Sequence, residues 1–176
     1  MEFRCETVYD RKALAAMARG IRKTAGKKRS RRAHVLGWIV IALGTFLIID
    51  SFASEGAAAL TAPTVINIIA VLAILTVFLW EDKINGAIAG KRTLPILKKA
   101  VTVFREDGYS TENDFGKSEL TYEHIVRIAE LPGYFVFVFS GNHGQVYAKC
   151  DLTGGSTDEF REFLERVAGK KVEQIR

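Results

Sequence analysis

The side chains most often used in catalysis and metal binding are few in this 176-residue chain and lie far apart. The two cysteines, Cys5 and Cys150, are isolated, and we expect both to be small core residues in strands because a cytoplasmic thiol stays reduced. The histidines His34, His124 and His143 do not have the spacing of metal ligands. They are expected at a membrane surface, before a strand and in a turn, respectively.

Carboxylates and glycines likewise show no catalytic arrangement. Glu119, Glu123 and Glu130 are predicted at strand ends, with no base or nucleophile beside them in a recognisable order. Residues 154–156 (Gly-Gly-Ser) precede a predicted helix and could cradle an anion, but a turn leading into a helix cap is the favoured interpretation. We therefore predict no catalytic residues, no metal, no cofactor and no enzymatic activity.

Charge is distributed very unevenly along the chain. The net charge of +5 combines +8 over residues 1–32, −2 over 33–80, +3 over 81–100 and −4 over 101–176. The positive charge thus flanks an almost uncharged block. Nucleic-acid binding is not expected, because no recognition module accompanies the basic residues.

Two apolar runs in the uncharged block predict transmembrane helices. Residues 33–49 and 60–80 contain no Lys, Arg, Asp or Glu, and as helices they are about 26 and 31 Å long, against a hydrocarbon core of about 30 Å. Neither run has the polar face of a soluble amphipathic helix. We place the spans at about 33–52 and 60–80. A cleaved signal peptide is not favoured, since 32 residues precede the first run and a second run follows.

The flanks of these runs predict the topology. Both outer flanks are basic, whereas the loop at residues 50–59 holds two acids and no base, so the positive-inside rule places both termini in the cytoplasm. The basic run before the first span is a topology signal and also a candidate for contact with anionic lipid headgroups. This run comprises Lys27, Lys28, Arg29, Arg31 and Arg32. Asn67, inside the second span, is a candidate for helix–helix contact within one chain or across a homodimer.

The segments next to the spans also carry structural signals. Residues 2–9 predict a short strand, and Asp10 can cap a helix that follows it. Residues 81–100 predict a helical continuation of the second span that breaks near Gly90 or Pro95. Gly86 and Gly90 lie outside the apolar run, and we expect them to provide flexibility.

From residue 101 onward the hydrophobic period changes to two, which predicts strands. Residues 134–140 should form a buried central strand, and 145–150 should pair back on it. Ser156 begins a capping box for an amphipathic helix that ends at Gly169. We expect five or six antiparallel strands and this closing helix, with the N-terminal strand added at the sheet edge.

Four stretches resemble the YcxB-like family of bacterial membrane proteins: residues 104–110 (FREDGYS), 120–130 (LTYEHIVRIAE), 134–139 (YFVFVF) and 160–164 (FREFL). The resemblance implies a C-terminal domain similar to pleckstrin-homology sheets closed by a helix, in the bacterial inner membrane. It supplies no catalytic residues. Residues 148–150 (Ala-Lys-Cys) depart from the Pro-Lys often found in the family before the last helix.

The predicted fold class is membrane α+β, with a two-helix transmembrane hairpin and a small antiparallel β-domain closed by a C-terminal helix. The predicted parts are residues 1–32, 33–80, 81–100 (a juxtamembrane helix or linker) and 101–176. We expect a membrane-tethered cytoplasmic binding or regulatory module. Its partners would be the lipid bilayer, anionic headgroups, a protein or a second copy. The alternative is an accessory subunit of a transport or envelope complex, recognised through its transmembrane helices.

Overall fold

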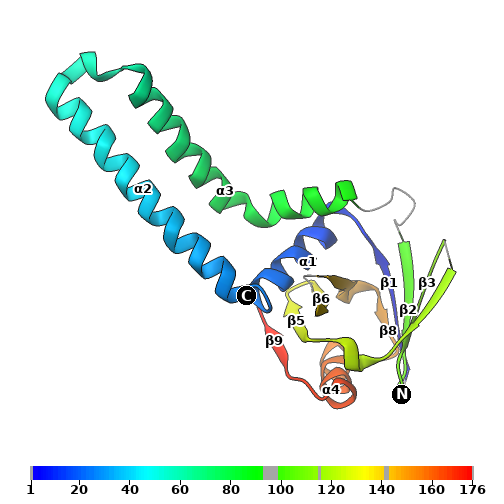
Figure 1. Ribbon diagram of the computed structural model, residues 1–176. Helices are drawn as coiled ribbons and strands as arrows, with labels where there is room; N and C mark the ends of the chain where they lie inside the picture. The colour runs from blue at the N-terminus through cyan, green and yellow to red at the C-terminus, as the bar shows by residue number, and fades with distance from the viewer. Residues whose placement is uncertain (1, 93–98, 115, 141–142, 176) are drawn as a thin grey trace. The chain divides into compact units, whose positions relative to one another are not determined.

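The computed structural model describes residues 2–92, 99–114, 116–140 and 143–175, except the side chains of residues 29, 57 and 89–92. It divides into two compact units (Figure 1). The helical unit is Lys28–Glu81, and the globular unit combines Met1–Lys27 with Asp82–Arg176. The chain thus leaves the globular unit once, forms the helical unit, and returns.

The helical unit is an antiparallel pair of helices. It contains most of α2 (Lys27–Glu55), the short 3-10 helix η1 (Gly56–Ala59) and the part of α3 (Ala62–Arg92) up to Glu81. The ring of His34 on α2 stacks on Phe78 of α3 at a centroid distance of 4.7 Å. Further along, Gly44 faces Val71, so the two helices run side by side in opposite directions. Both contain stretches long and apolar enough to cross a membrane, Ser30–Glu55 and Ala62–Ile88.

The helix ends differ from those predicted. Helix α2 continues through residues 53–55, beyond the predicted end of the first span near residue 52, because the first residue that favours leaving a helix is Gly56, with a φ of +55°. Helix α3 begins at Ala62, with Pro63 in its first turn. It continues beyond Trp80 to Arg92, which agrees with the predicted helical continuation of the second span. Its backbone leaves helical geometry at Trp80. Pro95, where a break was predicted, lies outside the described residues.

The apolar side chains of the helical unit are mostly exposed. Phe46 is 65% exposed and Leu79 is 78% exposed. Only 11% of the apolar window of α2 and 6% of that of α3 is buried. These helices therefore lack the protein cover that surrounds a core helix in a soluble protein.

The first sheet of the globular unit joins segments from both ends of the chain. Its strands are β1 (Phe3–Val8), β2 (Lys99–Phe104), β3 (Tyr109–Asn113), β4 (Gly116–Leu120) and β8 (Leu152–Thr153), in the order β4-β3-β2-β1-β8. Strand β1 pairs with β2 over six residues, from Phe3 opposite Phe104 to Val8 opposite Lys99. The predicted addition of the N-terminal strand is confirmed. Its predicted edge position is wrong, because the two-residue strand β8 covers its other side.

The second sheet is buried on both faces at its centre. Its strands are β5 (Arg127–Leu131), β6 (Tyr134–Val138), β7 (Gly144–Ala148) and β9 (Val172–Gln174), in the order β7-β6-β5-β9. Strand β6 places Phe135 and Phe137 in one core cluster and Val136 and Val138 in another, so the predicted buried central strand is confirmed. The prediction of purely antiparallel pairing is wrong, since β9 runs parallel to β5. The chain reaches β9 through a helix instead of a tight hairpin turn.

Helix α4 (Thr157–Ala168) completes the core between the sheets. Its predicted capping box is confirmed, because the Ser156 side chain accepts a hydrogen bond from the Glu159 backbone N–H while the Glu159 side chain accepts one from that of Ser156. It ends at Gly169, whose φ is +62°. Phe160 and Phe163 are buried and lie 5.0 and 5.1 Å from the ring of Phe3.

Helix α1 (Arg11–Lys23) covers the opposite face of the second sheet (Figure 1). Asp10 caps it as predicted, accepting a hydrogen bond from the Ala13 backbone N–H at 2.7 Å. Residues 82–92 of α3 belong to the same unit and dock on α1. There a Cβ atom on Gly86 would lie 2.8 Å from the Cα of Ala15. The expectation that Gly86 provides flexibility is therefore wrong, since its lack of a side chain permits close packing.

Candidate functional site

The predicted lipid-contact residues lie at the start of α2. The side chains of Lys27, Lys28, Arg31 and Arg32 are exposed there, whereas that of Arg29 lies outside the described residues. Because α2 begins at Lys27, its basic residues are spaced along the first two turns. The helix geometry therefore concentrates positive charge at one end of the helical unit.

The predicted helix-contact residue, Asn67, lies elsewhere in the same unit. Its side chain is half-buried and faces α2, where a Cβ on Gly44 would lie 3.8 Å from the Asn67 Oδ1. Gly44 is twelve residues beyond Arg32, about 18 Å along α2. The structure thus separates Asn67 from the basic run, and the two do not form one site.

The two cysteines occupy different environments. Cys5 is buried in β1, where its Sγ donates a hydrogen bond to the Ala148 carbonyl at 3.3 Å, and burial raises the pKa of its thiol to about 11. Cys150 is exposed in the 3-10 helix η4 (Lys149–Asp151), so its predicted place in a strand core is wrong. Strand β7 ends at Ala148, and the chain turns there. Both thiols are free.

The histidines do not converge on a common site. The Nδ1 of His34 lies 2.9 Å from the Ser30 carbonyl oxygen, which accepts a hydrogen bond in the tautomer that has the proton on Nδ1. The Nε2 of His34 lies 3.5 Å from the Glu81 carboxylate, within the helical unit. His124 is exposed in the 3-10 helix η2 (Tyr122–His124) before β5, and His143 is exposed just before β7. The last two positions agree with the sequence prediction.

Sequence analysis missed the environment of Glu130. Only 6% of this residue is exposed, and its carboxylate accepts hydrogen bonds from Lys149 Nζ at 2.6 Å and from Arg161 Nε and Nη2 at 2.5 and 2.8 Å. The bound Arg161, and secondarily Lys149, hold the pKa of Glu130 below its usual range. Arg161 also binds Asp158 at 2.7 Å. The network links β5, η4 and α4, and its charges neutralise one another, as expected of a structural ion pair.

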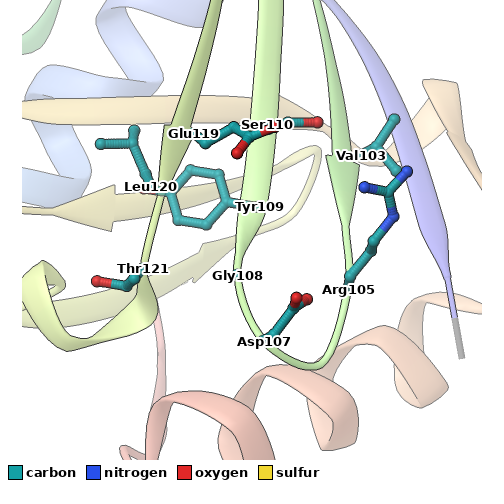
Figure 2. A pocket seen from close by; sticks show the side chains of 9 residues that line it. All are labelled: Val103, Arg105, Asp107, Gly108, Tyr109, Ser110, Glu119, Leu120 and Thr121. Atoms are coloured by element: carbon teal, nitrogen blue, oxygen red, sulfur yellow. The ribbon is translucent and has the colours of Figure 1, made fainter.

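A shallow hollow lies on the outer side of β2, β3 and β4. Its volume is about 210 Å³, and Arg105, Asp107, Ser110 and Glu119 contribute its polar atoms. Figure 2 shows Arg105 and Asp107 near the β2–β3 turn, with Ser110 and Glu119 further along the neighbouring strands. Arg105 is paired with Glu2 at 2.9 Å. The mixed signs of charge give this hollow no preference for an anion or a cation.

A larger cavity, of about 350 Å³, lies inside the globular unit. Its walls come from the residue after β1, from α1, and from strands β2, β3, β4 and β7. The lining residues are Tyr9, Leu14, Met17, Ala100, Thr111, Asn113, Ser118, Leu120, Gly144 and Gln145. Its volume falls within the range of small-molecule sites, roughly 300–1,000 Å³. We name it the α1 cavity.

The cavity exists because side chains become smaller along the inner face of the first sheet. The first row across four paired strands consists of Phe3, Phe104, Tyr109 and Leu120. The second row consists of Cys5, Thr102, Thr111 and Ser118, and the third of Thr7, Ala100, Asn113 and Gly116. The aromatic row packs against α4, whereas the rows of small residues leave space beneath α1. These rows of small residues cannot be identified from the sequence alone, because they depend on the register of the paired strands.

Three tyrosines lie near the cavity and remain protonated. Burial raises the pKa of Tyr9, Tyr109 and Tyr147, and the proximity of Tyr9 and Tyr109 contributes further. Tyr147 donates a hydrogen bond to the Gln145 Oε1 at 2.7 Å. The Tyr109 Oη is buried and has no hydrogen-bond partner among the described residues. Of the three, only Tyr9 lines the cavity, where its neutral hydroxyl can bind a polar group without adding charge.

Part of the chain is similar to a known protein family. Residues 104–164 match the model of the YcxB-like protein family. The predicted resemblance is confirmed over this segment, about a third of the chain. No match was found among curated proteins.

The YcxB-like segment contains only part of the site. It holds the whole Glu130–Lys149–Arg161 network and six lining residues of the α1 cavity, from Thr111 to Gln145. The other four lining residues, Tyr9, Leu14, Met17 and Ala100, lie before the matched segment. The cavity therefore requires the N-terminal strand and helix as well as the YcxB-like segment.

Proposed function

We propose that this protein is a membrane-anchored binding module of the bacterial cytoplasmic membrane, with α2 and α3 crossing the bilayer and the globular unit in the cytoplasm. The observation that carries the proposal is the insertion of the helical unit between two paired strands. Strands β1 and β2 are adjacent in one sheet, although about ninety residues separate them in the sequence.

This insertion supports a common side for both chain ends. Since Lys27 and Asp82 belong to one compact unit, a hairpin that leaves and returns to that unit crosses the bilayer twice. The basic residues at the start of α2 favour the cytoplasm for that side, and the lack of Lys and Arg in residues 50–59 favours the other side for the tip.

The strand order supports a pleckstrin-homology-like assignment for the globular unit. Strands β1–β4 form one antiparallel series and β5–β7 a second, and α4 follows them in sequence. The helical unit then occupies the connection between the first two strands. The resemblance implied two such sheets closed by a helix, which agrees with this order.

A binding role fits the site better than a catalytic one. The Glu130 carboxylate is engaged by two cations, and the α1 cavity presents hydroxyls, amides and apolar groups. Such walls hold a ligand by shape and hydrogen bonds, without an activated nucleophile or a titrating base.

Reporter fusions test the topology. A reporter at Ser54 should indicate the outside, and one after Arg176 the cytoplasm. The opposite pair of readings, or a cytoplasmic Ser54, would overturn the proposal.

Photo-crosslinking in the full chain tests where recognition occurs. A crosslinker at Ser118, on the rim of the α1 cavity, should capture a ligand or partner in the membrane. One at Leu72, exposed on α3, should capture mainly lipid. Partner adducts from Leu72 alone would instead support the accessory subunit recognised through its helices. Isolated residues 101–176 are unsuitable for this test, because they lack β1 and α1.

The basic run has two proposed roles that a triple variant separates. Replacing Lys28, Arg31 and Arg32 with Gln should yield a mixed orientation of the Ser54 reporter if the charges set the topology. An unchanged orientation with weaker binding to anionic lipids would assign them to headgroup contact, worth about 1 kcal/mol per residue.

A further inference from the structure

We propose that the α1 cavity binds an uncharged single-chain amphiphile, such as a short monoacylglycerol, with its chain among the apolar walls and its hydroxyl or ester group at the amide and phenol side. The proposal deepens the binding role above and rests on it. The cavity is formed entirely within the globular unit, by strands of both sheets and by α1.

The space is a consequence of the sheet and not a defect at one residue. Three adjacent strands place Thr102, Thr111 and Ser118 in the row next to the one that carries Phe104, Tyr109 and Leu120. Small side chains recur on each of these strands, so a rotamer change of one side chain cannot fill the cavity. The cavity opens at Ser118, which is exposed on β4, so a ligand can enter it.

The walls of the cavity are apolar on the helix side. Leu14 and Met17 project from α1, and Leu120 closes the other end from β4. Methionine is flexible and polarisable, which suits a wall that must accommodate chains of different shape. These side chains would surround an alkyl chain.

Polar groups also line the cavity. The Gln145 carbonyl already accepts a hydrogen bond from Tyr147, and the amide nitrogen of Gln145 carries donors that this bond does not use. Tyr9, Thr111 and Ser118 add hydroxyl groups to the lining. A ligand hydroxyl or ester would match these groups.

The charge of the walls selects against ionic headgroups. None of the described residues that line the cavity is Lys, Arg, His, Asp or Glu. A carboxylate or phosphate placed there would lose its hydration without gaining a counter-charge, which is strongly unfavourable. The walls therefore fit a glyceryl or alcohol head and reject a fatty acid.

A methyl NMR experiment on the full chain tests the proposal directly. The chain contains only two methionines, Met1 and Met17, and Met17 lines the cavity. With methyl-labelled methionine and the protein in phosphatidylcholine nanodiscs, 1-octanoylglycerol should shift the Met17 signal saturably. Octanoate has the same chain and a charged head, and half saturation of the shift should require a concentration about tenfold higher or more.

Two variants on one strand provide the matched control. Ser118→Phe places a ring in the cavity and should abolish the saturable shift. Lys117→Phe adds the same ring on the other face of β4 and should leave the shift unchanged. If Ser118→Phe loses its folded circular dichroism signal, Gln145→Leu replaces it and should weaken binding at least about fivefold.

The outcomes are distinct. Absence of a saturable Met17 shift in the wild type, or an equal shift in folded Ser118→Phe, overturns the ligand proposal. Tighter binding of octanoate than of the glyceride overturns the assignment of an uncharged head. The reporter fusions at Ser54 and Arg176 test membrane anchoring separately, so either proposal can fail while the other stands.

Discussion

The helical unit and the globular unit treat similar residues in opposite ways. Phe46 and Leu79 in the helices are mostly exposed, whereas Phe104 and Phe160 in the globular unit are fully buried. The difference arises from how the apolar residues are distributed along each element. The helices are apolar around their whole circumference. In the strands, apolar and polar residues tend to alternate, so the apolar side chains lie on one face of the sheet and can be buried together. Apolar content alone therefore does not indicate where a protein places its core.

The comparison also separates two sources of stability. The globular unit provides its own apolar surroundings, from the rings around Phe3 and Phe104 to the valines beneath α1. The helical unit offers little such cover, so under the proposed function the bilayer supplies its apolar surroundings. Four substitutions test this difference between the units, and they follow in order of decreasing expected effect.

The largest effect is expected from Phe160→Ala. The ring lies 5.0 Å from Phe3 and Phe104 and 5.2 Å from Phe135, so its loss leaves a cavity at the centre of the core. The free energy of unfolding should fall by about 4 kcal/mol, measured by denaturant titration of the full chain in nanodiscs. Phe46→Ala, on the exposed face of α2, is the control and should change it little. Equal decreases in the free energy of unfolding for the two variants would contradict the proposed difference between the two units.

Glu130→Gln is expected to cost about 3 kcal/mol, because it leaves two cations next to a neutral amide in a mostly buried site. The pKa of Glu130 is lowered on folding. Its contribution is therefore present above the unfolded pKa, near 4.5, and is lost as the pH falls through the lower folded value. Unfolding curves at pH 7 and pH 3 should show a larger difference between wild type and variant at pH 7. Glu119→Gln, an exposed carboxylate, is the control, and an equal pH response would contradict the prediction.

Leu43→Arg tests the environment of the helical unit. A charge at the middle of a membrane helix costs about 2.5 kcal/mol or more, so the share of the chain recovered in the membrane fraction should fall. Leu60→Arg lies between η1 and α3 and should be tolerated. Unchanged membrane recovery of Leu43→Arg would show that α2 does not require lipid.

The smallest effect is expected from Ser156→Ala, which removes the hydroxyl that accepts from the Glu159 backbone N–H at 3.2 Å. The free energy of unfolding should fall by about 1 kcal/mol. Thr121→Ala is a matched control, because Thr121 precedes η2 without forming a side-chain cap. A loss as large as that of Phe160→Ala would mean that the cap organises the core and not only α4.

Local features of this protein could be predicted from the sequence. The Asp10 and Ser156 caps, the apolar helices, the buried strand β6 and the resemblance to the YcxB-like family all depend on residues within a few turns or strands of one another. Capping and hydrophobic periodicity are short-range effects, so their signals lie in contiguous segments. The end of α2 was predicted too early, because no residue between 50 and 55 breaks a helix.

Only the tertiary structure decided how distant segments combine. Strand β1 takes its place beside β2 across the whole helical unit, and Glu130 finds partners 19 and 31 residues away. The α1 cavity depends on the register of four strands, which places small residues from separate segments in the same rows. A one-residue shift in any strand would turn those residues to the other face. The sequence therefore determined the elements, and the pairing of the strands determined the site.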